Sequence, residues 1–218
     1  MRIAVLNPDT IGDVIIRQPA FAAIKARGHQ LTIAVRDLVA PIAGMIAPGA
    51  AVIQYPCNPY VWRFDWESPN GLEFLRKLRA ADPDLLVIAP FQHTEFEESV
   101  AGFFPRVRVV GFDGLLYRDG YPPTAADSFR RRPQPLIAAA LQTAETRKSE
   151  LLCSAVLGEN VSLPAPRLKV SSRVRAAASR RLATLGLAGE KFWCVCAGDF
   201  PGVEVRNWDA AQWAELMR

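Results

Sequence analysis

The chain has 218 residues, which at about 150 residues per domain is enough for between one and two domains. Half of the residues are hydrophobic and 22% are charged, which excludes disorder over most of the chain because there is enough apolar surface to offset the chain entropy. The 26 Lys and Arg residues against 22 Asp and Glu give a net charge of +4. This mild excess permits anionic partners such as phosphates or lipid head groups, but it does not indicate a nucleic acid.

The sequence shows no targeting or metal-binding signal. Its first apolar run, residues 3–6, is too short for a signal peptide. No stretch approaches the roughly 20 apolar residues that cross a bilayer. We therefore expect a cytoplasmic protein that could still work at a membrane surface. The two histidines and four scattered cysteines form neither a disulfide framework nor a set of metal ligands, so we expect no metal.

Strand and helix signals alternate along the first half of the chain. Short apolar runs predict buried parallel strands, and helical spacing or acidic first turns predict the helices between them. Pro19 either kinks the first helix or marks its true first turn. The pattern predicts an α/β fold with a Rossmann-like, doubly wound parallel sheet. The predicted strands are 3–6, 31–35, 51–55, 85–89 and 107–111, and the helices are 13–27, 38–45, 71–81 and 95–104.

The regular alternation stops after the fifth predicted strand. Residues 112–135 contain Gly, Pro and a basic run and predict a long surface loop, which 136–157 follow as a predicted helix. A linker, a helix that begins at Ser171 or Ser172, a strand at 191–197 and a helix from Trp208 come next. We therefore expect a domain over 1–157, a linker and crossover helix over 158–190, and the first strand-loop-helix unit of an incomplete second domain over 191–218.

Asp13 is the first candidate for a catalytic group. It follows Gly12 at the carboxyl end of the first predicted strand, which is the edge where open α/β sheets bind ligands. Gly12 lets another group approach the backbone closely, and a carboxylate there could accept a proton from a hydroxyl group. The alternative is that Asp13 only caps the helix, and position alone does not separate the two.

Gln92 and His93 are candidates for substrate binding. Both follow the fourth predicted strand, again at the carboxyl edge of the sheet, and could line a ligand cleft. The alternative for His93 is a loop histidine with satisfied hydrogen bonds.

Several arginines are candidates for phosphate binding. Arg130, Arg131 and Arg132 could bind an anionic substrate, although the sequence alone favours a solvated loop. Arg206 precedes a predicted helix start, where phosphate binds well, or it stacks on Trp208. Neither a G-x-G-x-x-G nor a G-x-x-x-x-G-K-[ST] sequence is present, so we expect no dinucleotide cofactor and no P-loop.

An ordered set of segments resembles glycosyltransferase family 9, the ADP-heptose:lipopolysaccharide heptosyltransferases. The likeness runs along essentially the whole chain. Its opening elements are Met1-Arg2-Ile3-Ala4-Val5-Leu6, Ile11-Gly12-Asp13-Val14-Ile15, Pro19-Ala20 and Ile24-Lys25. Its later elements are Asp82-Pro83-Asp84-Leu85-Leu86-Val87-Ile88, residues 150–158, Pro166-Arg167-Leu168, Ala197-Gly198, Arg206-Asn207-Trp208 and Trp213-Ala214-Glu215-Leu216.

The resemblance implies a GT-B architecture of two Rossmann-like domains and an inverting transfer that needs neither metal nor cofactor. The first domain would take a lipid-linked, anionic saccharide acceptor near the inner face of the membrane. The second would take the nucleotide sugar, ADP-heptose by this likeness. Asp13 would be the general base that deprotonates the acceptor hydroxyl. Gly198 and Arg206 would hold the phosphates of the donor.

The sequence also departs from the family pattern. The loop after the fourth predicted strand, residues 89–93, lacks the usual acidic residue and Gln-Gly pair. The late Asp-[Ser/Thr]-Gly-x-x-His donor motif does not occur before residue 218. We therefore expect the second domain to be truncated and this chain alone to be inactive as a transferase. The alternative is a non-catalytic binding module derived from the same fold.

Overall fold

The computed structural model describes residues 1–60, 64–115, 130–134, 136–191 and 215. The chain divides into two compact units, Met1–Lys169 and Val170–Arg218. The predicted strand over 191–197 and the predicted helix from Trp208 lie outside the described residues, apart from Lys191 and Glu215.

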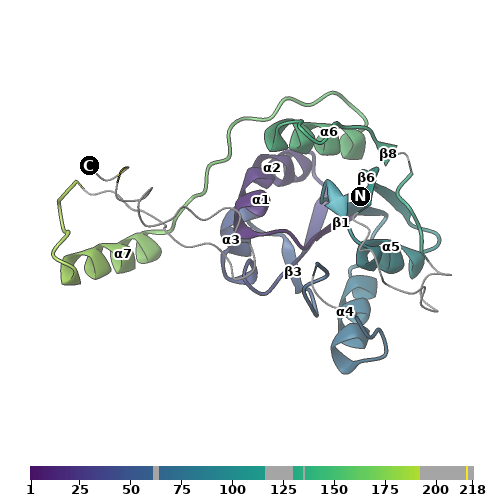
Figure 1. The fold of residues 1–218 in the computed structure, drawn as a ribbon, viewed down its shortest axis with the longest axis horizontal. Helices are drawn as coiled ribbons and strands as arrows, with labels where there is room; N and C mark the ends of the chain where they lie inside the picture. Colours follow the sequence, from purple (N-terminus) through teal and green to yellow (C-terminus); the bar gives the residue numbers. More distant parts are fainter. Residues whose placement is uncertain (61–63, 116–129, 135, 192–214, 216–218) are drawn as a thin grey trace. The chain divides into compact units, whose positions relative to one another are not determined.

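The first unit is built on a six-stranded parallel sheet with the strand order β3-β2-β1-β4-β6-β8 (Figure 1). This confirms the predicted α/β, Rossmann-like class. All five predicted strands are present, and each end lies within one residue of the position expected. The strands are β1 (Arg2–Asn7), β2 (Gln30–Val35), β3 (Ala51–Gln54), β4 (Leu85–Ile88), β6 (Arg108–Phe112) and β8 (Leu136–Ile137).

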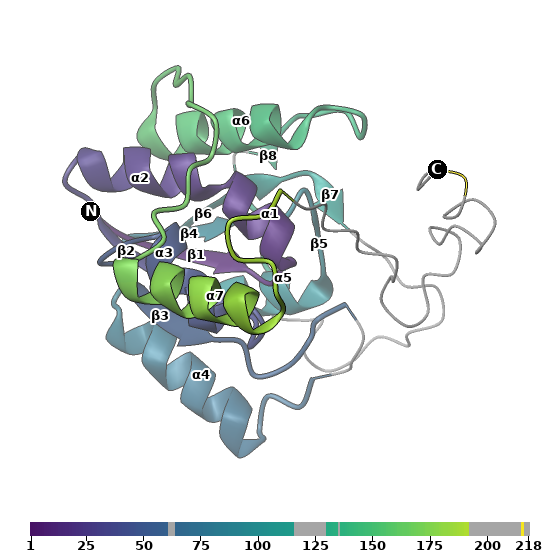
Figure 2. The ribbon, with the colours of Figure 1, turned by 90° about the vertical axis from the view of Figure 1, so that its left-hand side faces the viewer.

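The central strands β1 and β4 are buried on both faces, which is why they are continuous apolar runs. Successive side chains of a strand point to opposite faces. Accordingly, Ile3 and Val5 belong to one core cluster, whereas Ala4 and Leu6 belong to the other. The helices α1 (Ile11–Ile16), α2 (Gln18–Ala26) and α6 (Glu145–Leu157) lie over the first of these faces, and α4 (Pro69–Ala80) and α5 (Glu95–Gly102) lie over the second (Figure 2).

The helices of the first unit have identifiable start and stop signals. Ser68 accepts a hydrogen bond from the backbone of Gly71 at the start of α4, and Thr94 forms a capping box with Glu97 at the start of α5. Gly158, at φ +72°, ends α6. The helices are α1 (Ile11–Ile16), α2 (Gln18–Ala26), the 3-10 turn η1 (Ala40–Ile42), α3 (Ala43–Ile46), α4 (Pro69–Ala80), α5 (Glu95–Gly102) and α6 (Glu145–Leu157).

Pro19 resolves the question left open for the first helix. The predicted single helix is two helices, and Pro19 lies in the first turn of α2. The chain bends at Arg17, which ends α1 and precedes α2. Proline fits this place because the first turn of a helix needs no backbone N–H from it.

The predicted helix over 136–157 is wrong in its first part. Residues Leu136–Ile137 form β8, whose residues pair with Gly111 and Phe112 of β6, and the helix begins only at Glu145. The apolar residues here suit a helix and a strand equally well, and pairing with the edge of the sheet decides between them.

Residues 158–169 belong to the first unit, although the sequence suggested a linker from residue 158. Val161, Leu163 and Leu168 pack against the core beneath α6. The backbone of Leu163 donates to Glu150 Oε1 at 3.1 Å, and that of Arg167 donates to Gln18 Oε1 at 3.1 Å. These contacts fasten the segment to the domain.

In the second unit, the described part is dominated by α7 (Ser172–Thr184). Ser171 caps it by accepting from the backbone of Val174 at 3.3 Å, as the sequence predicted. Gly186, at φ +72°, follows its end.

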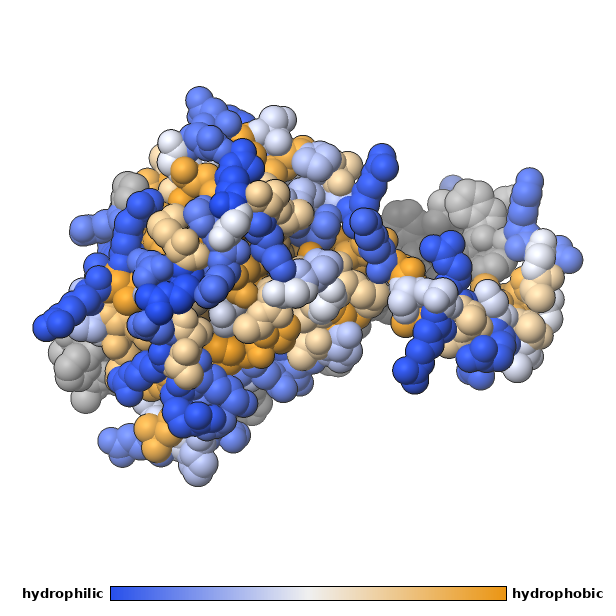
Figure 3. Space-filling view, turned by 180° about the vertical axis from the view of Figure 1, so that it is seen from behind, coloured by the Kyte–Doolittle hydropathy of each residue, from blue (hydrophilic) through white to orange (hydrophobic). Residues whose placement is uncertain are grey.

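On the face of the first unit shown in Figure 3, charged and polar side chains cover most of the area, with smaller apolar areas between them. None of the helices in the described part of the chain is both long enough and apolar enough to cross a membrane.

Candidate functional site

Asp13 lies where the fold reverses the direction in which strands are added. Strand β1 is flanked by β2 on one side and β4 on the other, so the chain leaves β1 in one direction and later returns to its other side. Ligands of open α/β sheets bind outside the carboxyl ends of the strands at such a switch point. Asp13 is half-buried in the first turn of α1, three residues after the loop that follows β1.

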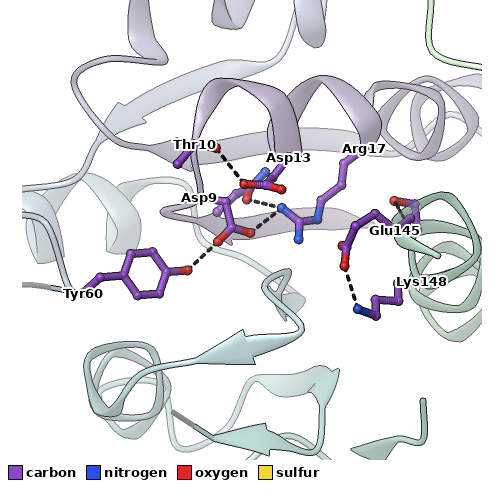
Figure 4. A network of polar contacts seen from close by, with 9 residues as sticks. Asp9, Thr10, Asp13, Arg17, Tyr60, Glu145 and Lys148 are labelled. Carbon is purple, nitrogen blue, oxygen red and sulfur yellow. Dashed lines mark hydrogen bonds and ion pairs between the residues drawn. The ribbon is translucent and has the colours of Figure 1, made fainter. Parts of the chain in front are cut away.

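The carboxylate of Asp13 has one oxygen held and one oxygen open. The hydroxyl group of Thr10 donates to Oδ2 at 2.8 Å (Figure 4). Oδ1 has no hydrogen bond or ion pair to any residue that the structure describes. At the neighbouring Gly12, an added Cβ would meet nothing within 4 Å. Thr10 occupies the N-cap position of α1, and its side chain makes no hydrogen bond to the backbone of the helix.

A buried ion pair that the sequence did not reveal lies beside Asp13. The side chain of Arg17 is 6% exposed and pairs with Asp9 Oδ2, while its Nη1 also donates to Asn7 Oδ1 at 2.9 Å. The hydroxyl group of Tyr60 donates to the other carboxylate oxygen of Asp9 (Figure 4). We call these four residues, Asn7, Asp9, Arg17 and Tyr60, the Arg17 clamp. Burial and the negative charge of Asp9 raise the pKa of Tyr60, so its hydroxyl keeps its proton and donates.

His93 and Gln92 lie on β5 (Gln92–His93), which pairs with β7 (Gly114–Leu115) outside the main sheet. Gln92 is exposed, but His93 is buried, with Nε2 3.2 Å from Glu98 Oε1. Its Nδ1 has no hydrogen-bond partner among the described residues. The histidine is thus held from inside the domain, and its predicted role in substrate binding stays a prediction.

Glu97 is a second buried acid near this edge of the sheet. Its Oε2 accepts from the backbone and hydroxyl groups of Thr94 at 2.8 and 2.7 Å, and Tyr55 donates to Oε1 at 3.3 Å. Complete burial raises the pKa of Glu97 to about 7, although the Thr94 hydrogen bonds act in the opposite direction.

The three consecutive arginines pack on α5. Arg130 pairs with Glu95 at 2.9 Å, and Arg132 lies 3.7 Å from Glu98. Arg131 donates to the backbone oxygens of Phe104 and Val107 just after this helix. These contacts give the three arginines a structural role. Their predicted binding of an anionic acceptor stays a prediction.

The predicted donor residues Gly198 and Arg206 lie outside the described residues. In the described part of the chain, no group of three His, Cys, Asp or Glu residues is arranged to hold a metal ion.

Comparison with known proteins gives matches at the level of structure. No family model matches the sequence, and neither does any curated protein. The structure of a glycosyl transferase family 9 protein from Veillonella parvula matches 98% of this chain with a TM-score of 0.60 and 14% identity. E. coli heptosyltransferase WaaC with ADP matches 100% of it, with a TM-score of 0.53 and 19% identity. WaaC with ADP-2-deoxy-2-fluoro heptose gives a TM-score of 0.50 and 20% identity.

These matches show that the chain shares its fold with solved glycosyltransferases. Its likeness extends to heptosyltransferases and a family 9 protein, as the sequence resemblance predicted. The chain spans 58%, 63% and 64% of the length of the three structures, in the order given.

Proposed function

We propose that this protein is a glycosyltransferase of the family 9 type, with its acceptor site in the first unit. It would transfer a heptose, or a related sugar, from a nucleotide sugar such as ADP-heptose to a lipopolysaccharide core or similar saccharide acceptor. The shared fold supports the class. The observation that carries the proposal is the carboxylate of Asp13, which lies at the switch point of the sheet with one oxygen open beside Gly12.

The proposed reaction inverts the anomeric carbon in one displacement. The acceptor hydroxyl donates to Asp13 Oδ1, and its oxygen attacks the anomeric carbon from the face opposite the leaving group. The new C–O bond forms as the bond to the nucleoside diphosphate breaks, and the hydroxyl proton passes to Asp13. Thr10 holds Oδ2, so the carboxylate presents Oδ1. Gly198 and Arg206 would hold the diphosphate without a metal ion.

Substitution of Asp13 tests the proposal. In Asp13→Asn, made in a chain that includes a complete donor domain, the side chain keeps its size but loses its basicity, so we expect ADP release from ADP-heptose to fall by roughly 100-fold or more. The Kd for the acceptor, measured by calorimetry, should change little. Asp82→Asn is the matched control, because Asp82 is an exposed carboxylate near the amino ends of the strands, whereas Asp13 lies near their carboxyl ends. Unchanged ADP release in Asp13→Asn would rule out the general-base role.

The same two measurements, ADP release and acceptor binding, distinguish the proposed transferase from the alternative, a non-catalytic binding module. Acceptor binding without ADP release by an unaltered chain that includes a complete donor domain would favour that alternative. The contacts of the three arginines with α5 and the residues after it are relevant to this choice. Side chains that already pair within the protein are less available to bind an anionic acceptor.

The acceptor of such an enzyme is anchored in lipid, so we also propose that the protein works in the cytoplasm with peripheral contact at the inner membrane surface. The net charge of +4 favours anionic head groups.

A further inference from the structure

The Arg17 clamp joins four segments that are separate in the sequence. Asn7 is the last residue of β1, Asp9 lies in the following loop, Arg17 lies between α1 and α2, and Tyr60 comes from the segment after β3. The side chains of Arg17 and Asp9 are only 6% and 14% exposed. Buried charges of this kind are costly unless they are paired, so Arg17 and Asp9 depend on each other.

The clamp is linked to the carboxylate of Asp13 through Thr10. Thr10, whose hydroxyl group holds Asp13 Oδ2, is the residue next to Asp9 in the chain. At the other end of α1, the backbone of Arg17 donates to the carbonyl oxygen of Asp13 at 3.3 Å. Arg17 therefore fixes the segment that carries Thr10 through its side chain, and it contacts Asp13 through its backbone (Figure 4).

Outside the clamp, the loop is held by Pro8, which is buried, and by the carbonyl oxygen of Thr10, which accepts from the backbone of Val14 at 3.1 Å. The side chain of Thr10 is exposed and makes no capping bond to the backbone of α1. Gly12 offers no side chain to pack, and the space beside it is open. The hydroxyl group of Thr10 is therefore placed both by the first turn of α1 and by the point at which Asp9 is held.

We propose that Arg17 is a positioning residue for Asp13, acting through Asp9 and Thr10, and that Tyr60 completes this support from the segment after β3. The proposal rests on the proposed function of Asp13. The guanidinium group of Arg17 suits this role because it is always charged and rigid. Its Nη1 contacts both the amide oxygen of Asn7 and the carboxylate of Asp9. The geometry of a catalytic carboxylate matters because a shift of about 1 Å can lower a rate by roughly 100-fold.

The test is the ¹³C chemical shift of the Asp13 carboxyl carbon in the full chain, read by NMR. Thr10→Val removes the hydroxyl that holds Oδ2 and gives the shift of the released carboxylate. We expect Arg17→Lys to move the Asp13 signal in the same direction, and the double variant to add little to either single one. Arg76→Lys is the matched control, because Arg76 grips both oxygens of Glu73 on the exposed face of α4.

Transfer kinetics supply a second readout. Arg17→Lys should lower kcat by about 10-fold to 100-fold, with smaller changes in both KM values. If Arg17→Lys does not fold, Tyr60→Phe removes only the hydroxyl group that donates to Asp9 and should shift the Asp13 signal to a smaller extent.

The two proposals fail in different ways. An Asp13 carboxyl signal that neither Arg17→Lys nor Tyr60→Phe moves would overturn the positioning role, whatever the activity. Unchanged transfer in Asp13→Asn would overturn the general-base role and leave the NMR result intact.

Discussion

At the scale of single residues, Glu97 makes the stability of the protein depend on pH. Its pKa is about 7 in the folded protein, because the side chain is completely buried, against 4.5 for an ordinary glutamate. The folded state therefore binds this proton more tightly than the unfolded state. The stabilisation is fully present below pH 4.5 and is lost as the pH rises through 7. The expected loss is about 3 kcal/mol in the free energy of unfolding, measured by urea denaturation at several pH values.

Glu97→Gln isolates this contribution. The amide keeps an oxygen for the Thr94 donors and a polar group beside Tyr55, but it cannot ionise. We expect the variant to lose most of the pH dependence between pH 4.5 and 8. Glu67→Gln, a change at an exposed glutamate, should leave the dependence in place. A curve for the unaltered protein that is flat over this range would contradict the prediction.

Sequence showed the place of Asp13 but not the residues that support it. Gly12-Asp13 follows a short apolar run, so the edge of the sheet could be predicted from local pattern alone. The contact between Asp9 and Tyr60 joins residues 51 positions apart, and only the fold brings them together. The same reason explains the basic run, since no local signal shows that Arg130 meets Glu95.

At the scale of elements, continuous apolar runs predicted five strands well, because all but the edge strand β3 are largely buried. Strand β8 escaped prediction because it has only two residues and depends on its pairing with β6. Its side chains alternate: Ile137 is 9% exposed and belongs to the core, whereas Leu136 is 42% exposed.

Two neighbouring alanine substitutions test this alternation. Ile137→Ala removes a side chain from the core and should lower the free energy of unfolding by about 2 kcal/mol. Leu136→Ala removes a largely exposed side chain and should cost roughly 0.5 kcal/mol. Both values can be measured by urea denaturation. Equal losses at the two positions would show that residues 136–137 do not form the strand described.

At the scale of the whole molecule, both core clusters lie within the first unit. Their described members end at Leu168, close to the division between Lys169 and Val170. The sequence placed the end of this domain at residue 157, because prolines and weak periodicity in 158–166 are typical of a linker. Periodicity cannot reveal that Val161 and Leu163 pack on the core, since their contacts are made by an irregular segment.

Two shortened chains distinguish these boundaries. A chain of residues 1–169 keeps both core clusters and should unfold cooperatively in urea. A chain of residues 1–157 loses the packing of Val161, Leu163 and Leu168 and the hydrogen bonds to Ser154, Glu150 and Gln18. Partly buried side chains and hydrogen bonds each contribute about 1 kcal/mol, so the shorter chain should be less stable by roughly 3 kcal/mol or more. Equal stability of the two chains would mean that residues 158–169 act only as a tether, and the boundary at 157 would be the correct one.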